Sequence, residues 1–238
     1  MSRDVSEDSR HEVSIPAGEV LLHGDLVVPP GARGVIVFAH GSGSGRFSPR
    51  NRRVARALRE GRLATLLFDL LTPGEEEAEV ETGHLRFDIG FLAGRLLAAT
   101  DWIVLQPPMR GLDVGFFGAS TGAAAALVAA AERPSGVSAI VSRGGRPDLA
   151  GPKLSRVRCP TLLLVGGEDR AVLRLNQEAL ARLDVEKKLQ IIAGATHLFE
   201  EPGALDQVAG IAREWLVRYL KSSSTARPRP PLAPEAPR

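Results

Sequence analysis

The feature that most constrains the fold of this chain is the run Gly118-Ala119-Ser120-Thr121-Gly122, which matches the pattern G-x-S-x-G. It follows a short apolar segment, Val114–Phe117, and precedes an alanine-rich stretch, 123–131. A strand, a sharp turn and a helix in this order would lift the Ser120 hydroxyl above a sheet, beside the free N–H groups that begin the helix. Glycine at both ends of the turn avoids collisions with the backbone. The run therefore predicts a nucleophilic serine with oxyanion donors already in place.

Length and charge bound the class of protein. The chain has 238 residues, the usual size of one α/β domain, and is long enough to bury a core without disulfides or metals. Its 30 Lys and Arg residues balance 28 Asp and Glu residues, for a net charge of +2, which argues against a nucleic-acid partner. No apolar run approaches the ~20 residues of a membrane span, so no membrane partner is expected either.

The single cysteine, Cys159, excludes a disulfide framework and fits a reducing compartment. It precedes Pro160 at the start of a predicted strand, so we expect a buried, unreactive thiol. Residues Met1–Glu12 are polar and charged, without the hydrophobic region of a secretion signal. We therefore expect a cytoplasmic protein.

Three segments divide the chain. Residues 1–12 are expected to form a disordered lead, residues 13–221 one domain, and residues 222–238, rich in Ser and then in Pro, Arg and Ala, a disordered tail. The domain begins with Val13–Ile15 and Glu19–Val28, which predict a hairpin. The second of these partly alternates apolar and polar residues, as a half-exposed edge strand would.

Six near-continuous apolar runs follow, and they predict strands covered on both faces, hence a parallel sheet. They are Val35–Ala39, Leu63–Phe68, Val114–Phe117, Val137–Val141, Thr161–Val165 and Leu189–Ile192. Segments 85–103 and 208–219 carry apolar residues every three or four positions, as helices do. An antiparallel start followed by such repeats predicts a doubly wound, mostly parallel α/β sheet, in which ligands bind at the carboxyl ends of the strands.

Two further residues complement Ser120 at that edge. Serine needs an adjacent base to act as a nucleophile, and the base needs a carboxylate to orient it. His197 follows the last predicted strand, and Asp169 directly follows the strand Thr161–Val165. Glu168 is the competing acid, and we favour Asp169 because a shorter side chain holds an imidazole more rigidly. The alternatives are a purely structural turn at Ser120 and a surface-loop histidine at position 197.

A glycine-rich loop, His40-Gly41-Ser42-Gly43-Ser44-Gly45, follows the strand Val35–Ala39. We expect the backbone N–H groups of Ser42 and Thr121 to form an oxyanion hole there. A phosphate-binding loop is the competing interpretation, but no Gly-Lys-Ser/Thr follows and the spacing is not G-x-G-x-x-G. His40 is expected to shape the loop rather than act as the base. Three other histidines are expected at the surface: His11, His23 and His84.

Four arginines also map near strand ends: Arg46, Arg50, Arg143 and Arg146. Of these, Arg46 and Arg143 are the candidates for holding a substrate carboxylate or phosphate through a bidentate contact. The alternative is solvation in loops, or salt bridges with the acids of Glu75–Glu81. That acidic run is itself expected to be a solvated loop.

In these residues the chain resembles the dienelactone hydrolase-like branch of the α/β-hydrolase superfamily, over about residues 13–221. The resemblance rests on His40-Gly41-Ser42-Gly43-Ser44, Gly118-Ala119-Ser120-Thr121-Gly122, Gly167-Glu168-Asp169 and Thr196-His197-Leu198-Phe199. It implies the α/β-hydrolase fold, with Ser120 as nucleophile, Asp169 as acid and His197 as base. The string Arg46–Asn51 also resembles a subgroup of hydrolases, some of which are fused to a phosphoribosyltransferase domain.

Dienelactone hydrolases proper have cysteine at the elbow, whereas this chain has serine. The resemblance therefore implies acyl transfer without identifying a dienelactone as the substrate. About twenty residues separate Val141 from Thr161, which leaves room for only a minimal cap. An open, shallow site favours small or flexible esters.

Together these observations predict a serine hydrolase that cleaves a small carboxylic ester, lactone or thioester through an acyl-enzyme, without a metal or organic cofactor. Two alternatives stand beside it: a non-catalytic ligand-binding protein on the same fold, and an acyltransferase. The oligomeric state is left open.

Overall fold

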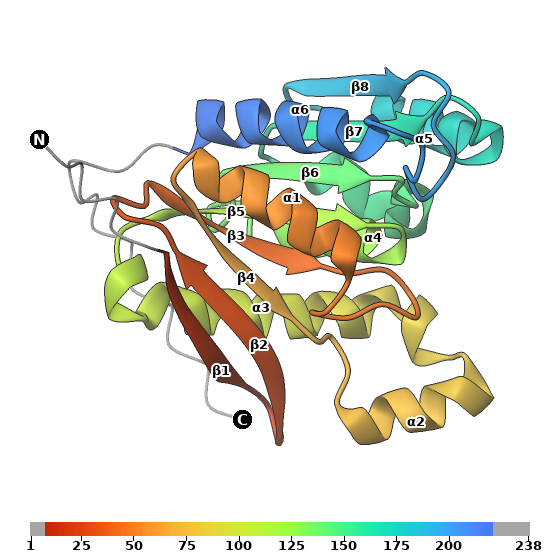
Figure 1. Cartoon of the computed structure of the whole chain (residues 1–238). Helices are drawn as coiled ribbons and strands as arrows, with labels where there is room; N and C mark the ends of the chain where they lie inside the picture. Colours follow the sequence, from red (N-terminus) through yellow and green to blue (C-terminus); the bar gives the residue numbers. More distant parts are fainter. Residues whose placement is uncertain (1–7, 221–238) are drawn as a thin grey trace, which may run out of the picture.

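All six apolar runs form strands of one sheet in the computed structural model, which describes residues 8–220 (Figure 1). The strands are β3 (Gly34–Ala39), β4 (Leu63–Phe68), β5 (Asp113–Ala119), β6 (Ala139–Arg143), β7 (Thr161–Gly166) and β8 (Lys187–Ile192). They run parallel in the order β4-β3-β5-β6-β7-β8. All but the edge strand β8 are buried along nearly their whole length, which explains why their sequences lack alternation. The predicted α/β sheet is confirmed.

The N-terminal hairpin is longer than the sequence predicts. β1 (Ser9–Ala17) and β2 (Val20–Val28) pair antiparallel throughout. The assignment of residues 9–12 to a disordered lead is therefore wrong, because their backbone pairs with Asp25–Val28 whatever the polarity of their side chains. β1 is the edge strand opposite β8, and β2 lies between β1 and β4, so the expectation of an edge strand at residues 19–28 is wrong. The rest of the predicted lead, 1–7, and the predicted tail, 222–238, lie outside the described residues.

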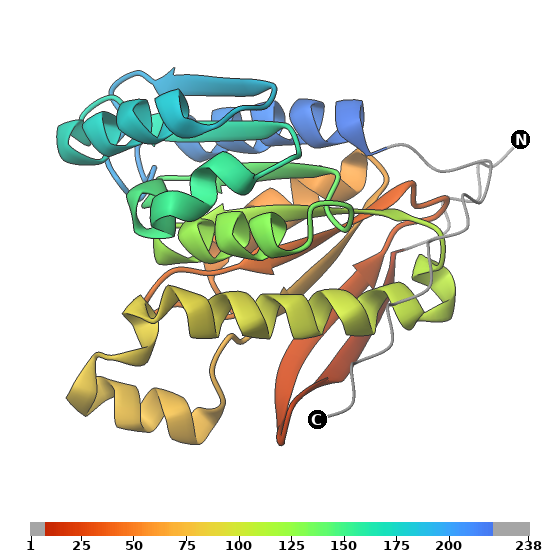
Figure 2. The same cartoon turned by 180° about the vertical axis from the view of Figure 1, so that it is seen from behind.

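Helices cover both faces of the sheet. On one face lie α1 (Pro49–Glu60) and α6 (Ala204–Tyr219), in front of the strands in Figure 1. Figure 2 shows the other face, which is covered by α3 (Ile89–Leu105), α4 (Thr121–Glu132) and α5 (Arg170–Arg182). Every residue of α4 except Glu132 is buried. Its many alanines let it lie close to both the sheet and α3, which sets the helix start firmly behind Ser120.

The acidic run forms a helix, α2 (Pro73–Thr82), and the prediction of a solvated loop is wrong. The helix begins with a capping box: Thr72 Oγ1 accepts from Glu75 N–H at 3.3 Å, and the Glu75 carboxylate accepts from Thr72 N–H at 2.7 Å. Two otherwise unpaired backbone donors are satisfied in this way. Thr72 followed three residues later by Glu75 indicates a helix start, and this pattern predicts the structure of the run better than its high charge does.

Glu79 holds this helix against the chain that follows it. Its buried carboxylate accepts from Leu85 N–H at 2.7 Å, from Arg86 N–H at 3.0 Å and from Arg86 Nε at 2.7 Å. Leu85 and Arg86 belong to a short 3-10 turn, η1 (Leu85–Phe87). We call residues 72–88 the α2 arm; it projects beyond the sheet at the lower right of Figure 1.

The connections that lead into β5 and β7 are compact. Between β6 and β7 the chain forms η3 (Pro147–Arg156), which packs on α4, and η2 (Pro107–Met109) leads into β5. The predicted minimal cap between Val141 and Thr161 agrees with this arrangement. Within residues 8–220, no helix has the length and apolar character needed to cross a membrane.

Candidate active site

Ser120 lies at the turn between β5 and α4, with a φ of 50° and a ψ of −122°, a conformation that few residues other than glycine adopt. Steric contact explains the glycines around it. A Cβ on Gly122 would lie 2.2 Å from the carbonyl oxygen of Ala39, and one on Gly118 would lie 2.4 Å from the Cα of Ala123. The sharp strand–turn–helix predicted from the sequence is present.

The loop after β6 holds the Ser120 backbone on both sides. Ser120 N–H donates to the carbonyl oxygen of Arg143 at 3.3 Å, and Arg146 N–H donates to the carbonyl oxygen of Ser120 at 3.1 Å. Between these two, Gly144 has a φ of 52°, and a Cβ on it would lie 3.1 Å from the carbonyl oxygen of His197. The same short loop therefore contacts both the serine turn and the histidine loop.

Asp169 and His197 meet beyond the ends of β7 and β8. Asp169 Oδ2 lies 2.6 Å from His197 Nδ1, while Asp169 Oδ1 accepts from Val172 N–H at 3.4 Å and caps α5. The Asp169 carboxylate thus both caps α5 and bonds to the His197 ring. The competing acid, Glu168, is exposed. The geometry favours Asp169 over Glu168 as the partner of His197.

Ser120 lies one loop away from this pair. Among the described side chains, no hydrogen bond joins Ser120 to His197. The His197 side chain is 39% exposed, and the Asp169 side chain is 14% exposed. Nucleophile and base are often loosely arranged in a free enzyme and tighten when substrate binds. The structure therefore joins two of the three predicted residues and places the third on the adjacent loop.

Glu201 positions the histidine loop, and no motif in the sequence singles it out. Its Oε1 accepts from Thr196 N–H at 3.0 Å and from Thr196 Oγ1 at 2.5 Å. The hydrogen bond from the Thr196 hydroxyl lowers the pKa of Glu201 below its ordinary value. In the sequence, Glu201 is simply an acid four residues after His197, and within a loop this spacing predicts no contact.

The oxyanion loop is built around a buried histidine. His40 Nε2 accepts from Leu70 N–H at 3.0 Å, so Nδ1 carries the proton and donates to the carbonyl oxygen of Gly41 at 3.0 Å. Burial lowers the pKa of His40. Both ring nitrogens are bonded to backbone, which agrees with the predicted role of His40 in shaping the loop. His11, His23 and His84 are exposed, as predicted.

Ser42 and Thr121, whose backbone N–H groups are predicted to form the oxyanion hole, are in contact, but the N–H of Ser42 already donates a hydrogen bond. Ser42 N–H donates to Thr121 Oγ1 at 3.2 Å, and the two hydroxyl oxygens are 3.1 Å apart. Ser42 N–H can therefore bind an oxyanion only after the Thr121 side chain releases it. The sequence predicts the placement of Ser42 beside Thr121, but not this hydrogen bond.

Arg46 is held within the fold. Its Nη1 lies 3.5 Å from Asp25 Oδ1, its Nε lies 3.3 Å from Asp69 Oδ2, and its N–H donates to Asp69 Oδ1 at 2.7 Å. These contacts favour the structural alternative over substrate binding for Arg46. The partners of Arg46 are Asp25 and Asp69, whereas Glu79 and Glu75 of the acidic run pair with Arg86 and Arg95.

Arg143 differs from the other strand-end arginines. It is 8% exposed, and its Nη1 is fully buried without a hydrogen-bond acceptor among the described residues. Burial, and then the charge of Arg50, lower its pKa to about 10. By contrast, Arg50 Nη1 donates to Glu200 at 2.9 Å, and Arg146 forms two hydrogen bonds with Asp148.

Cys159 is buried, and burial raises the pKa of its thiol to about 12. The predicted burial of the thiol is therefore confirmed, and its raised pKa keeps it protonated at neutral pH. Within residues 8–220, no group of three or more His, Cys, Asp and Glu side chains is arranged to hold a metal ion.

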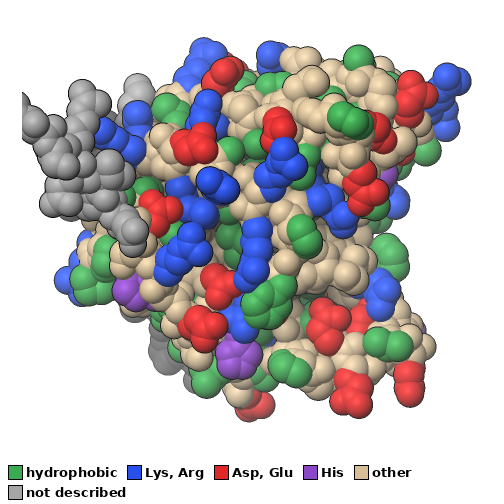
Figure 3. All heavy atoms as spheres, viewed as in Figure 1, with side chains coloured by type: hydrophobic (Ala, Val, Ile, Leu, Met, Phe, Trp, Pro, Cys, Tyr) green, Lys and Arg blue, Asp and Glu red, His purple; other side chains and the backbone are tan. Residues whose placement is uncertain are grey.

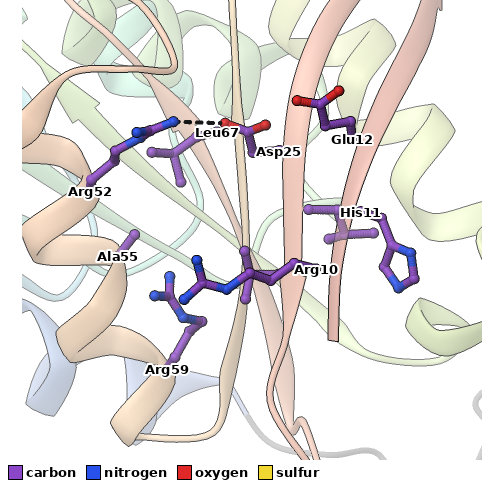
Figure 4. A pocket seen from close by; sticks show the side chains of 10 residues that line it. Arg10, His11, Glu12, Asp25, Arg52, Ala55, Arg59 and Leu67 are labelled. Atoms are coloured by element: carbon purple, nitrogen blue, oxygen red, sulfur yellow. Dashed lines mark hydrogen bonds and ion pairs between the residues drawn. The ribbon is translucent and has the colours of Figure 1, made fainter. Parts of the chain in front are cut away.

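A cavity of about 350 Å³ lies apart from the predicted site residues, between α1 and the β1–β2 hairpin (Figure 4). Arg10, Arg52 and Arg59 line it; Arg52 pairs with Asp25, and Arg59 pairs with Asp8. Basic and acidic side chains are interspersed on this face of the molecule (Figure 3). None of the predicted site residues lines the cavity.

No family model matches this chain. Two curated proteins of Mycobacterium tuberculosis, from strains CDC 1551 and H37Rv and provisionally named phosphoribosyl transferases, are 55% identical over 209 residues. The match covers 88% of this chain but 46% of those proteins, so the chain spans less than half their length. Their name therefore assigns no activity to this chain.

Solved structures identify both fold and family. Est1E from Butyrivibrio proteoclasticus, 16% identical, matches 87% of this chain and 98% of its own with a TM-score of 0.72, which shows the fold. A dienelactone hydrolase from Anabaena variabilis is 58% identical, with a TM-score of 0.88. That match covers 90% of this chain and 99% of the other. The chain therefore belongs to the dienelactone hydrolase-like family of α/β-hydrolases.

Proposed function

We propose that this protein is a serine hydrolase that cleaves a small carboxylic ester, lactone or thioester through a covalent acyl-enzyme. Ser120 is the nucleophile, His197 the general base, and Asp169 the carboxylate that orients His197. Backbone N–H groups of Ser42 and Thr121 stabilise the oxyanion. The hydrolase family supports this reaction class, and the substrate range follows from the compact connection between β6 and β7.

In the proposed reaction, Ser120 Oγ attacks the carbonyl carbon while His197 Nε2 accepts the hydroxyl proton. The tetrahedral oxyanion collapses, and the leaving alkoxide or thiolate takes that proton from His197. Water then attacks the acyl-enzyme and gives a proton to His197. Ser120 Oγ leaves as the acid product forms and takes the proton back.

The observation that carries the proposal is the hydrogen bond of 2.6 Å between Asp169 Oδ2 and His197 Nδ1, beside the elbow that holds Ser120. An imidazole that donates from Nδ1 to a carboxylate has Nε2 free to act as a base. A binding protein on the same fold would have no use for this pair next to a serine held in a rare backbone conformation.

The proposal is tested by the intact mass of the protein after exposure to a fluorophosphonate, which modifies activated serines. We expect one adduct on the wild type, none on Ser120→Ala, and one on Ser155→Ala, whose side chain is exposed away from the elbow. An adduct on Ser120→Ala, or none on the wild type, would contradict the proposal. Release of free acid rather than a new ester in the presence of competing alcohols separates a hydrolase from an acyltransferase.

A further inference from the structure

The cavity between α1 and the N-terminal hairpin has a floor made by side chains of three adjacent strands (Figure 4). Arg10 of β1 lies opposite Val27 of β2. Two residues further along β1, Glu12 lies opposite Asp25, which in turn lies opposite Leu67 of β4. Residues opposite one another on paired strands, and residues two apart on one strand, project from the same face of a sheet. The floor therefore combines apolar side chains with charged ones.

One side of α1 forms the wall of this cavity. Arg52, Ala55 and Arg59 follow one another at intervals of three and four residues, so they lie along the same side of the helix. Within residues 8–220, no helix covers the β1–β2 hairpin on this face of the sheet, because α1 packs on β4 (Figure 1). A hollow of about 350 Å³ results, which is a usual size for a small-molecule site.

Two guanidinium groups meet at one end of the hollow, which we call the basic end. Arg59 is 12% exposed; its Nε donates to Asp8 at 2.8 Å and its Nη1 donates to Thr65 Oγ1 at 3.3 Å. Its Nη2 has no acceptor among the described residues. The Arg10 guanidinium points towards Arg59 (Figure 4) and forms no ion pair or hydrogen bond within residues 8–220. The basic end thus has free donors on both arginines.

The charges at the basic end repel one another. Burial lowers the pKa of Arg59, and the charges of Arg10 and Arg56 lower it further, against the opposing effect of Asp8. Both guanidinium groups nevertheless stay charged at neutral pH. An anion between them would accept from the free donors and remove the repulsion.

The other end of the hollow is different. Arg52 Nη2 lies 3.3 Å from Asp25 Oδ2, so these two charges balance, and Glu12 has no ion-pair partner among the described side chains. Val27 and Leu67 lie on the floor as apolar surface. The unbalanced positive charge is therefore confined to the basic end, with apolar surface beside it.

We propose that this cavity is a second binding site, which takes a small molecule with a phosphate or carboxylate group. The anionic group lies between Arg10 and Arg59, where two planar guanidinium forks can bond to its oxygens. An apolar part of the same molecule covers Val27 and Leu67. None of the residues proposed for catalysis lines the cavity, so the site does not depend on the hydrolase activity.

The test is calorimetric titration of the full chain with phenyl phosphate, which joins a dianion to an apolar ring. We expect one site, a lower Kd than for inorganic phosphate because the ring covers apolar surface, and weaker binding as NaCl is added. Arg10→Gln, an exposed change, should raise Kd about tenfold, as the loss of one charge-assisted hydrogen bond would. Glu12→Gln should lower Kd, because it removes a negative charge from the cavity.

Arg53→Gln is the matched control, because Arg53 lies on the α6 side of α1 and pairs with Asp206. It should bind phenyl phosphate as the wild type does. Benzoate separates the two anionic groups: binding of phenyl phosphate but not benzoate indicates a phosphate site, and the reverse indicates a carboxylate site. If none of the three anions binds, or if Arg10→Gln and Arg53→Gln bind them equally well, the proposal is overturned.

Discussion

Gly166 packs so closely against Ala195 that a Cβ on Gly166 would lie 2.3 Å from the carbonyl oxygen of Ala195. Gly166 ends β7 just before the loop that carries Asp169, and Ala195 precedes His197 by two residues. A hydrogen bond of 3.0 Å from Glu168 N–H to the same carbonyl oxygen also joins the two loops. The distance between acid and base is therefore set by backbone packing rather than by their own hydrogen bond alone.

We expect Gly166→Ala to separate the two loops. Forcing a methyl group into this contact should destabilise the protein by about 1–3 kcal/mol and lower kcat more than it changes KM. Gly210→Ala is the matched control, because Gly210 lies in α6 with no atom near its missing Cβ. That variant should keep wild-type activity and gain about 0.5–1 kcal/mol of stability, measured by urea unfolding. Equal activity in the two variants would show that the packing does not position the pair.

Ser120 itself should cost stability, because its φ of 50° and ψ of −122° suit glycine. We expect Ser120→Gly to be more stable than Ser120→Ala by about 1–3 kcal/mol, with both variants inactive. Urea unfolding of the two variants at one pH measures the difference. Equal stability would mean that the elbow is not strained.

Asp169 has two functions that a single substitution separates. Asp169→Asn retains an oxygen for the Val172 N–H cap but no longer holds His197 in the tautomer with Nδ1 protonated. We expect kcat to fall by about 10⁴-fold with little change in Tm. Glu168→Gln, an exposed neighbour, should behave as the wild type. The opposite pattern would make Glu168 the orienting acid.

The sequence could predict the elements that position these residues because each leaves a local pattern. Near-continuous apolar runs predict β3 to β8, and the glycines at positions 118 and 122 predict the turn at Ser120. Side-chain length favours Asp169 over Glu168, and the structure adds a second reason, because Asp169 also caps α5 where it meets His197. The start of α5 thus positions the Asp169 carboxylate as much as His197 does.

What the sequence missed depends on contacts between distant segments. The strand at residues 9–12 is polar and is recognised only through its pairing with β2. Arg46 and Arg143 look alike as strand-end arginines, yet Arg46 meets Asp25 and Asp69, whereas Arg143 meets no carboxylate within residues 8–220. Their environments depend on which loops the sheet order brings together, and no local pattern carries that information.

The α2 arm should depend on one buried carboxylate. Desolvation would raise the pKa of Glu79, but hydrogen bonds from Arg86 and Leu85 outweigh it and lower that pKa. Glu79→Gln presents an amide to donors that need an acceptor, so we expect the arm to detach. Limited trypsin digestion should then cleave after Arg86 faster than in the wild type. Glu77→Gln, an exposed change on the same helix, should cleave at the wild-type rate; equal rates in the two variants would mean that Glu79 does not hold the arm.

His40 should make stability depend on pH in a defined direction. Burial lowers its pKa in the folded protein, whereas the unfolded chain takes up a proton near the reference value of ~6.5. Below that value unfolding binds a proton, so the free energy of unfolding should fall as pH falls towards the folded pKa, by up to about 1.4 kcal/mol per pH unit. Urea unfolding between pH 5.5 and pH 8 measures this slope. His40→Asn should be less stable than the wild type at pH 8, because it loses the ring bonds to Leu70 and Gly41, and should show a smaller slope. His84→Gln, an exposed change, should keep the wild-type slope, and a slope that persists in His40→Asn would assign the titration to another group.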